Sequence, residues 1–266
     1  MKRSILIFSV AVAIISLTCF GLMNKNNSAT AQETVAPRNP VVFNTGLSEM
    51  FGETAEINFL YDFGPRFELT VTKKELAEIK SMKDLYHEES IITYRAVTIT
   101  IVENERLTSK RASGANEFLN KTQIEFLKSF EYSTNFQIGG DVVRKNKETG
   151  ELEDGFSRPH VTVVPEVQAQ YLNGRAALLD YLKKESKEEV AKLDEKKLQP
   201  GKVFFTITKN GTISNVRLLL TCGYDSIDKM MLKLIENAPG KWKPAANSES
   251  EIIEQELVFS FGDMGC

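Results

Sequence analysis

The sequence predicts an α+β protein with an N-terminal export segment and two folded parts, and three observations support that prediction. An uncharged apolar run covers residues 5–23, directly after Lys2 and Arg3. Strand-like and helix-like stretches alternate over residues 42–166. Residues 168–266 combine alternating strands, an Asn-Gly pair and two amphipathic stretches. The length of 266 residues fits one or two domains after a targeting segment.

Residues 1–31 are expected to direct export as a signal peptide or a membrane anchor. A positive start, the apolar run at 5–23 and the small residues Ala29 and Ala31 before Gln32 are typical of a cleaved secretory signal. The run is also long enough, at ~20 residues, to remain as an anchor. Both alternatives place the rest of the chain in the periplasm or elsewhere in the cell envelope. Contact with the membrane is expected only through residues 5–23, if they are not cleaved.

A short tether at residues 32–41 is expected to lead into an α+β domain with an antiparallel sheet at residues 42–166. Thr72 and Glu75 have the spacing of a capping box, which predicts a short helix after Thr72. Residues 91–102 are rich in β-branched side chains and predict a strand. The other expected elements are a helix from Asn120 or Thr122, strands at 136–143 and 160–164, and a polar loop at 145–155 with Gly150 in a left-handed turn. These residues indicate no particular chemistry.

The clearest local pattern is a hairpin in the last third of the chain. Two alternating stretches, 203–208 and 213–220, flank Asn210 and Gly211. An Asn-Gly pair in this position predicts a type I′ turn, because both central residues of that turn need positive φ. The residues expected to share a face are Val203, Phe205 and Ile207 in the first strand, and Val216, Leu218 and Leu220 in the second.

Two helices and a last strand complete the predicted module. Residues 174–187 form an amphipathic helix, with Ala177, Leu178, Tyr181 and Leu182 on one face. Residues 225–235 form another, capped by Asp225 or Ser226 and ended by Pro239-Gly240. Residues 252–261 alternate as a strand. A right-handed crossover then places the first hairpin strand in the centre of a three-stranded sheet, with helices on one face and the last strand at an edge.

These residues resemble the C-terminal domain of TonB, in the version found in Bacteroidetes-type proteins. The resemblance covers residues 168–266, about a third of the chain. It is carried by the segment 201–216, by Ser226-Ile227-Asp228, by Pro239, Trp242 and Pro244, and by Tyr171-Leu172-Asn173-Gly174 with the helix after it.

The resemblance implies a non-enzymatic periplasmic module that binds extended segments of an outer-membrane receptor or another envelope protein. Binding would occur by strand addition to the edge of the last strand, with Ile253, Gln255 and Leu257 as the partner-binding residues. Whether the module also takes part in TonB-dependent transport is left open. The partner and the oligomeric state stay open.

A second interpretation also stays open, in which the chain is a secreted or envelope scaffolding protein that reuses this fold. Glu251, Glu254 and Glu256 would then protect the edge from pairing. Residues 5–23 lack the histidine that energy transducers of this family carry in their anchor helix, and the chain has no long proline-rich spacer. Both departures argue against transmission of force.

Other classes of function find little support in the sequence. The formal net charge is −3, and no basic stripe follows residue 31, so nucleic acid is not an expected partner. His87 and His160 are far apart, which gives no metal-ligand spacing. No phosphate loop, CxxC pair or nucleophile elbow occurs. We therefore expect no catalytic residue, metal or cofactor.

Cys222 and Cys266 are the cysteines that remain if the export segment is removed. An oxidising compartment favours a disulfide between them, but two free thiols are an equally open alternative. Trp242, the only tryptophan, is expected to pack its ring against the core rather than to contact a peptide.

Overall fold

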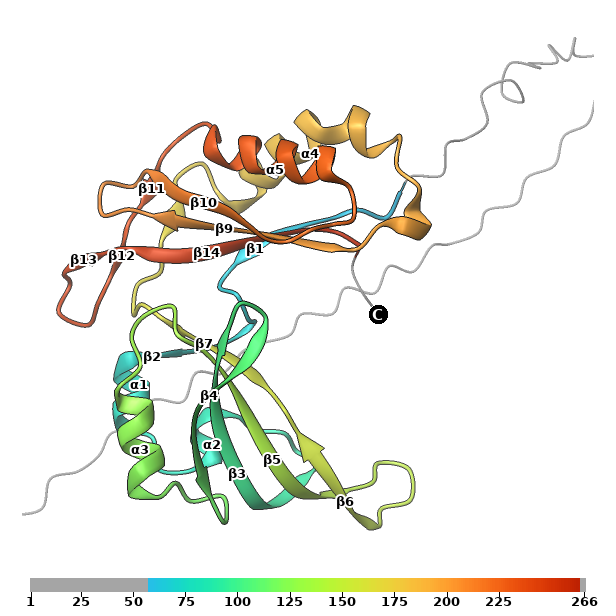
Figure 1. Cartoon of the computed structure of the whole chain (residues 1–266). Coiled ribbons are helices and arrows are strands. Elements are labelled where there is room, and N and C mark those ends of the chain that lie inside the picture. The colour runs from blue at the N-terminus through green and yellow to red at the C-terminus, as the bar shows by residue number, and fades with distance from the viewer. Residues whose placement is uncertain (1–56, 264–266) are drawn as a thin grey trace, which may run out of the picture. The chain divides into compact units, whose positions relative to one another are not determined.

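The computed structural model describes residues 57–263, which lie within one compact unit, Gly52–Cys266 (Figure 1). The predicted export segment and tether lie outside the described residues, so both stay predictions. Among the helices of residues 57–263, none is long and apolar enough to cross a membrane. The described chain is a mixture of helices and strands with several antiparallel sheets, as the sequence predicts.

One sheet contains the three long strands of the last third of the chain. Its strands lie in the order β1 (Leu60–Gly64), β14 (Gln255–Gly262), β9 (Pro200–Ile207) and β10 (Ile213–Leu220), and all neighbours are antiparallel. The predicted central strand is therefore confirmed as β9. The prediction of three strands is wrong, because β1 adds a fourth from far earlier in the sequence.

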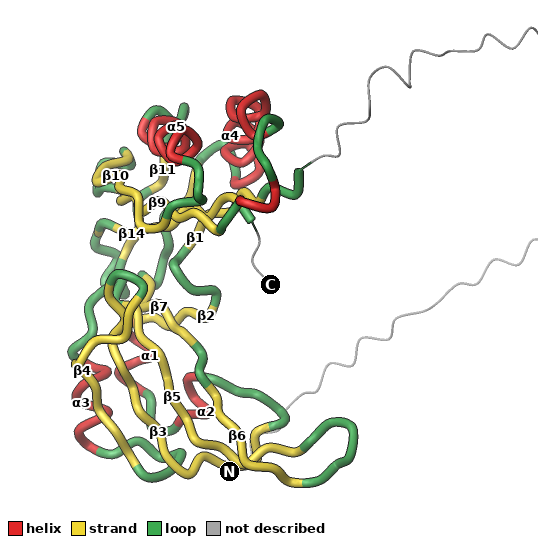
Figure 2. Tube along the Cα trace, turned by 45° about the vertical axis from the view of Figure 1, so that its right-hand side comes forward, coloured by secondary structure: helices red, strands yellow, loops and turns green. Residues whose placement is uncertain are grey.

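Helices α4 (Arg175–Val190) and α5 (Asp225–Glu236) lie on the same face of this sheet (Figures 1 and 2). Inward residues of β9 and β14 meet the apolar stripes of both helices in one core cluster. The fully buried members include Leu178, Leu182, Ile227, Met231, Ile235, Val203, Phe205, Ile207, Phe259 and Phe261. The alternation of the strands and the helical spacing thus predicted this core, although Ala177 is exposed.

Helix α5 begins at Asp225, with Tyr224 at its N-cap and no side-chain cap, so the predicted caps are wrong. A buried carboxylate instead fixes the residues that precede the helix. Asp228 accepts hydrogen bonds from the Thr221 hydroxyl and from the Cys222 N–H, the latter at 3.0 Å. Asp228 therefore ties the chain that enters α5 to the first turn of the helix.

The hairpin between β9 and β10 is not the predicted type I′ turn. Only Gly211, at φ 74°, has a positive φ in this loop. Its N–H donates to the Thr208 carbonyl at 2.9 Å, and the Thr208 N–H donates to the Thr212 carbonyl at 2.9 Å. This is a type I turn followed by a left-handed glycine. Such a three-residue loop fits the twist of the two strands, as a two-residue type I′ turn does. The Asn-Gly pattern identified the hairpin but not its length.

A second, six-stranded sheet contains residues from the middle of the chain. Its strands are β2 (Leu69–Thr72), β7 (His160–Val164), β5 (Asn135–Lys145), β3 (Ile91–Glu103) and β4 (Arg106–Gly114), in that spatial order, with β6 (Leu152–Ser157) also paired to β5. The expected antiparallel sheet is wrong in one respect, since β2 and β7 are parallel. The polar loop ends earlier than predicted because β6 begins at Leu152, while Gly150 has the predicted positive φ, at 74°.

The helices of this part are α1 (Lys73–Glu78), α2 (Met82–Leu85) and α3 (Lys121–Lys128). The predicted capping box of Thr72 and Glu75 is confirmed, and Asn120 caps α3 with Gln123. Gln123 is fully buried and also donates to the Val97 carbonyl at 3.1 Å, which joins α3 to β3. A separate core cluster under this sheet contains Val97, Ile99, Leu127, Phe136, Ile138 and Val161.

Short pairs finish the last third of the chain. They are β8 (Gln170–Tyr171) with β11 (Trp242–Lys243), and β12 (Ala245–Ala246) with β13 (Ile252–Ile253), in addition to the 3-10 turn η1 (Glu195–Lys197). Trp242 is 5 % exposed, so the prediction of a core-packed ring is confirmed. The backbone N–H of Trp242 donates to the Gly211 carbonyl at 3.2 Å, which attaches the hairpin loop to β11.

Replacing Gly211 by alanine should destabilise the fold by about 2 kcal/mol or more, as strain and a clash add together. A Cβ there would lie 2.2 Å from the Trp242 carbonyl oxygen. The matched control is Gly150→Ala, at the same φ of 74° but with its nearest neighbour at 3.8 Å, so only strain of about 1 kcal/mol applies. Urea unfolding of both variants measures the difference. Equal losses would show that the contact with Trp242 has no energetic consequence.

Candidate functional site

The outer edge of β14 is the candidate site, and the structure shows it occupied by the chain itself. β1 pairs with β14 from Leu60↔Gly262 to Gly64↔Val258. The predicted edge strand is therefore an interior strand over Val258–Gly262, which corrects the prediction. The physical reason is that an unpaired edge beside an apolar core attracts an extended segment, and β1 supplies one.

The predicted partner-binding residues lie just beyond the part of β14 that β1 covers. Ile253 belongs to β13 and pairs with Ala245. Gln255 is 1 % exposed, and its side-chain oxygen accepts a hydrogen bond from the Ala169 N–H at 2.7 Å. Leu257 is 3 % exposed in the core. Their side chains therefore hold the module together, and a role in binding through their backbone stays a prediction.

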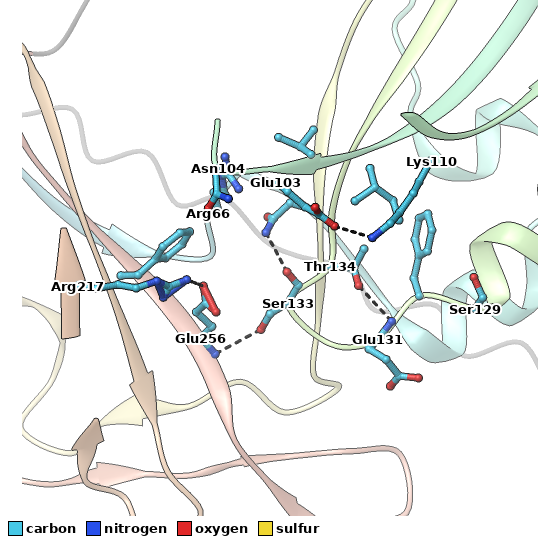
Figure 3. A pocket seen from close by; sticks show the side chains of 15 residues that line it. Arg66, Glu103, Asn104, Lys110, Ser129, Glu131, Ser133, Thr134, Arg217 and Glu256 are labelled. Atoms are coloured by element: carbon cyan, nitrogen blue, oxygen red, sulfur yellow. Dashed lines mark hydrogen bonds and ion pairs between the residues drawn. The ribbon is translucent and has the colours of Figure 1, made fainter. Parts of the chain in front are cut away.

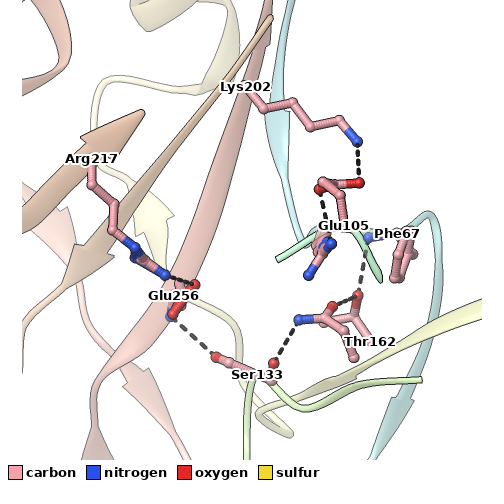
Figure 4. A network of polar contacts seen from close by, with 9 residues as sticks. Phe67, Glu105, Ser133, Thr162, Lys202, Arg217 and Glu256 are labelled. Carbon is pink, nitrogen blue, oxygen red and sulfur yellow. Dashed lines mark hydrogen bonds and ion pairs between the residues drawn. The ribbon is translucent and has the colours of Figure 1, made fainter. Parts of the chain in front are cut away.

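The backbone between these residues already has one partner. The Glu256 N–H donates to the Ser133 hydroxyl oxygen at 3.3 Å, and no strand of the described residues pairs with this side of Gln255–Leu257 (Figure 4). The stretch Gln255–Leu257 of β14 thus has an edge whose backbone is covered by the Ser133 side chain and not by the hydrogen bonds of a neighbouring strand. A single hydroxyl is easier to displace than a paired strand.

The aromatic side chains of β1 and of the residue before it point into the core. Phe59 stacks on Phe261 at 6.4 Å between centroids, and Tyr61 lies 6.4 Å from Phe259. Phe63 meets Trp242 edge to face at 5.7 Å and is 7 % exposed. Aromatic pairs at these distances add to the free energy of burial. The aromatic residues therefore anchor β1, one on each successive inward position.

Helix α4 holds β1 through polar contacts. The Arg175 guanidinium donates to the Phe63 carbonyl, forms an ion pair with the Asp62 carboxylate, and lies 4.5 Å above the Phe63 ring. The hydroxyls of Tyr61 and Ser186 share a hydrogen bond of 2.6 Å. Burial raises the pKa of Tyr61, and the hydrogen bond with Ser186 opposes that rise. Arg175 and Ser186 thus recognise one extended segment from the same helix.

The other edge of the sheet, β10, is less suited to strand addition. Its pairing with β9 shifts register between Ser214 and Arg217 and again between Leu218 and Leu220. Asn215 has a positive φ of 51° at the first irregularity. Bulges twist an edge and interrupt its row of donors and acceptors. The second irregularity places Leu220 opposite Lys202, whereas Leu218 lies opposite the buried Val203, so the predicted common face of this strand is wrong at Leu220 alone. Leu218 and Leu220 are 39 % and 37 % exposed.

A groove of about 440 Å³ opens beside Glu256 (Figure 3). Its charged lining residues are Arg66, Lys110 and Arg217 on the basic side, and Glu103, Glu131 and Glu256 on the acidic side. Lys110 pairs with Glu103 at 2.9 Å and Arg217 with Glu256 at 3.2 Å. The charges are balanced and largely paired, so the groove offers no field that would select an ionic ligand.

Arg66 lies deepest among these charges, with 3 % of its side chain exposed. It forms an ion pair of 2.8 Å with Glu105, which also lies 3.7 Å from Lys202 (Figure 4). The guanidinium lies over the rings of Phe67 and Phe204, at 5.2 Å and 5.8 Å from their centroids. Arg66 therefore has a structural explanation as a cation held between two aromatic rings and a carboxylate.

The residues considered for catalysis remain apart. His160 contacts the Gln137 amide at 2.9 Å and stacks near Phe67, and burial, helped by the charge of Arg66, lowers its pKa. Within residues 57–263 no three His, Cys, Asp or Glu side chains gather as metal ligands.

Comparisons with family models, curated proteins and solved structures find no match for the chain. The resemblance to TonB C-terminal domains therefore depends on the residues of the chain itself.

The sequence-based reasoning missed β1, although a signal was present. Phe59, Tyr61 and Phe63 alternate with Leu60 and Asp62, and Gly64-Pro65 follows them, which is typical of a short strand. The alternation could not indicate which sheet the strand would join.

Replacing Phe63 by alanine should lower the free energy of unfolding by about 3 kcal/mol, because a buried ring and its contact with Trp242 are lost. Phe156→Ala is the matched control, since that ring is 65 % exposed, and its change should stay within about 0.5 kcal/mol. Chemical denaturation measures both. A loss below about 1 kcal/mol for Phe63→Ala would show that β1 adds little to the fold.

Cys222 is buried, and burial raises the pKa of its thiol from 9.0 to about 12, a rise that a backbone hydrogen bond with Tyr224 opposes and Asp228 reinforces. Cys266 lies outside the described residues, so the disulfide stays a prediction. In the reduced protein, the unfolded chain loses this proton above about pH 9 while the folded chain keeps it. The thiol's contribution to stability is thus complete below pH 9 and is lost as the pH rises towards 12.

The stability difference between the reduced protein and Cys222→Ala should accordingly shrink by about 1 kcal/mol per pH unit above pH 9. Urea unfolding at pH 8, 9 and 10 measures it, and the variant removes the effect of all other titrating groups. Parallel pH profiles of the two proteins would contradict the raised pKa. Thiol titration of the denatured, unreduced chain without residues 1–31 separately tests the Cys222–Cys266 bond: two free thiols there would exclude it.

Proposed function

We propose that residues 168–266, completed by β1, form a non-enzymatic module that binds extended segments of other envelope proteins by strand addition at β14. The observation that carries the proposal is the pairing of β1 with β14. A segment almost two hundred residues away in sequence lies on this edge in extended form, with backbone pairing and inward aromatic side chains. Strand addition combines backbone hydrogen bonds for affinity with alternate side-chain contacts for specificity.

Three features support this proposal. The element order of α4, β9, β10, α5 and β14 is the order that the resemblance to TonB C-terminal domains implies. The bulges of β10 leave β14 as the more regular edge. The candidate export segment at residues 1–31 would place the module in the periplasm, where an outer-membrane receptor or another envelope protein is accessible. A link to TonB-dependent transport belongs to the same proposal.

The alternative function is an envelope scaffold in which β1 is a permanent strand. The burial of Phe63 favours this alternative, because dissociation of β1 would expose a core aromatic ring to water at a cost in free energy. The two functions differ in whether the β14 edge accepts a strand from another molecule.

Backbone amide shift mapping with an extended peptide from an outer-membrane receptor tests the proposed function. The expected shifts fall on Gln255–Gly262 and on the residues of β9 that face them. The control is the same peptide with proline at alternate positions, which removes the backbone donors and should abolish the shifts. Shifts confined to residues away from 252–262, or equal shifts with the proline peptide, would refute strand addition at β14.

A further inference from the structure

The segment from Phe59 to Phe63 has the chemistry of a bound peptide ligand. Phe59, Tyr61 and Phe63 enter the core on alternate positions, while the intervening Asp62 carboxylate meets Arg175. The Phe63 carbonyl receives a second contact from the same guanidinium. Each of these groups contacts a side chain of the module outside β1. The site therefore selects for the positions of the aromatic rings and for one negative charge.

β1 is one of the two edge strands of this sheet, and Phe63 is its one buried residue. It pairs on one side only, and Tyr61 and Leu60 are half-buried while Asp62 is exposed. The inward residues of β9, by contrast, are fully buried between two neighbours. Segments with few buried contacts and one-sided pairing open at lower free energy than central strands. Opening of β1 would uncover a complete binding edge without disturbing the pairing of β9 with β14.

The connection after β1 keeps it close to its site. Only residues 65–68 separate Gly64 from the first residue of β2. A short connection gives an effective concentration on the order of millimolar for the tethered strand. A segment of another protein must therefore compete with β1, which lowers its apparent affinity for the intact chain.

We infer that β1 is a tethered ligand of β14 that exchanges with an extended segment of another protein, and that this segment carries aromatic residues at positions one, three and five and a carboxylate at position four. This inference rests on the proposed function and names the chemistry of its partner. The proposed occupant is a peptide strand. It must bind β14 with enough affinity to compete with the tethered β1.

A reversible disulfide lock tests the exchange. Asp62 and Ser260 are register partners, so Asp62→Cys with Ser260→Cys should bond β1 to β14, in a background with Cys19 and Cys266 replaced by serine. The matched control lock is Thr206→Cys with Ser214→Cys, which are register partners in β9 and β10 and leave β1 free. The probe is a fluorescent peptide of residues 57–64, and a second peptide has serine in place of Tyr61 and Phe63.

The expected result is binding of the first peptide to the control lock and to the reduced β1 lock, and no binding to the oxidised β1 lock. Phe63→Ala in the chain should strengthen peptide binding roughly tenfold or more, because it weakens the competitor, and the serine peptide should bind at least roughly tenfold more weakly. Equal binding to the oxidised and reduced β1 lock would overturn the inference, since the peptide would then occupy another edge.

Hydrogen exchange on the wild-type chain keeps the inference testable if a variant fails to fold. The amides of β1 should exchange at least roughly tenfold faster than those of Val203–Ile207 in β9, as expected for an element that opens separately. Equal protection of β1 and β9 would overturn the inference. Exchange of the chain's own peptide without binding of a receptor peptide would refute the envelope partner alone. Binding of a receptor peptide at β14 that the lock does not affect would refute the tethered ligand alone.

Discussion

The pairing of β14 on both of its sides is the constraint on which the last third of the molecule depends. A strand that packs one face against α4 and α5 cannot leave its neighbouring edge as open backbone without exposing the core beside it. β9 satisfies one side over the full length of β14, and β1 satisfies the other from Val258 to Gly262. The aromatic side chains of β1 then close the core between α4 and the sheet.

Trp242 joins this closure to the rest of the module. Its ring contacts Phe63 in β1, Tyr171 in β8 and Phe205 in β9, at centroid distances between 5.4 and 5.9 Å. Its backbone binds the carbonyl of Gly211 in the hairpin loop. Three distant parts of the sequence, which are β1, β8 and the β9–β10 hairpin, therefore meet at Trp242.

β10 and β14 protect their outer sides in different ways. β10 interrupts its own hydrogen-bonding row with bulges, which keeps it from templating a partner. β14 instead is regular and is covered by a strand that has polar contacts on one helix and aromatic contacts in the core. The edge of β14 differs from the bulged edge of β10, because removal of β1 would leave a regular row of backbone donors and acceptors that can pair with another strand.

The sequence by itself determined the local elements of this protein. Period-two alternation in β9 and β14, the helical spacing of Ile227, Met231 and Ile235, and the capping box of Thr72 all depend on neighbours a few residues apart, and the structure has each of them. Only the tertiary structure decided which edges are open. The alternation of Phe59, Tyr61 and Phe63 is local, but its partner β14 lies at the other end of the chain, and no local pattern encodes that pairing. The hairpin loop likewise contacts the backbone of Trp242 at Gly211, and a contact with a residue so far along the chain is a property of the assembled fold.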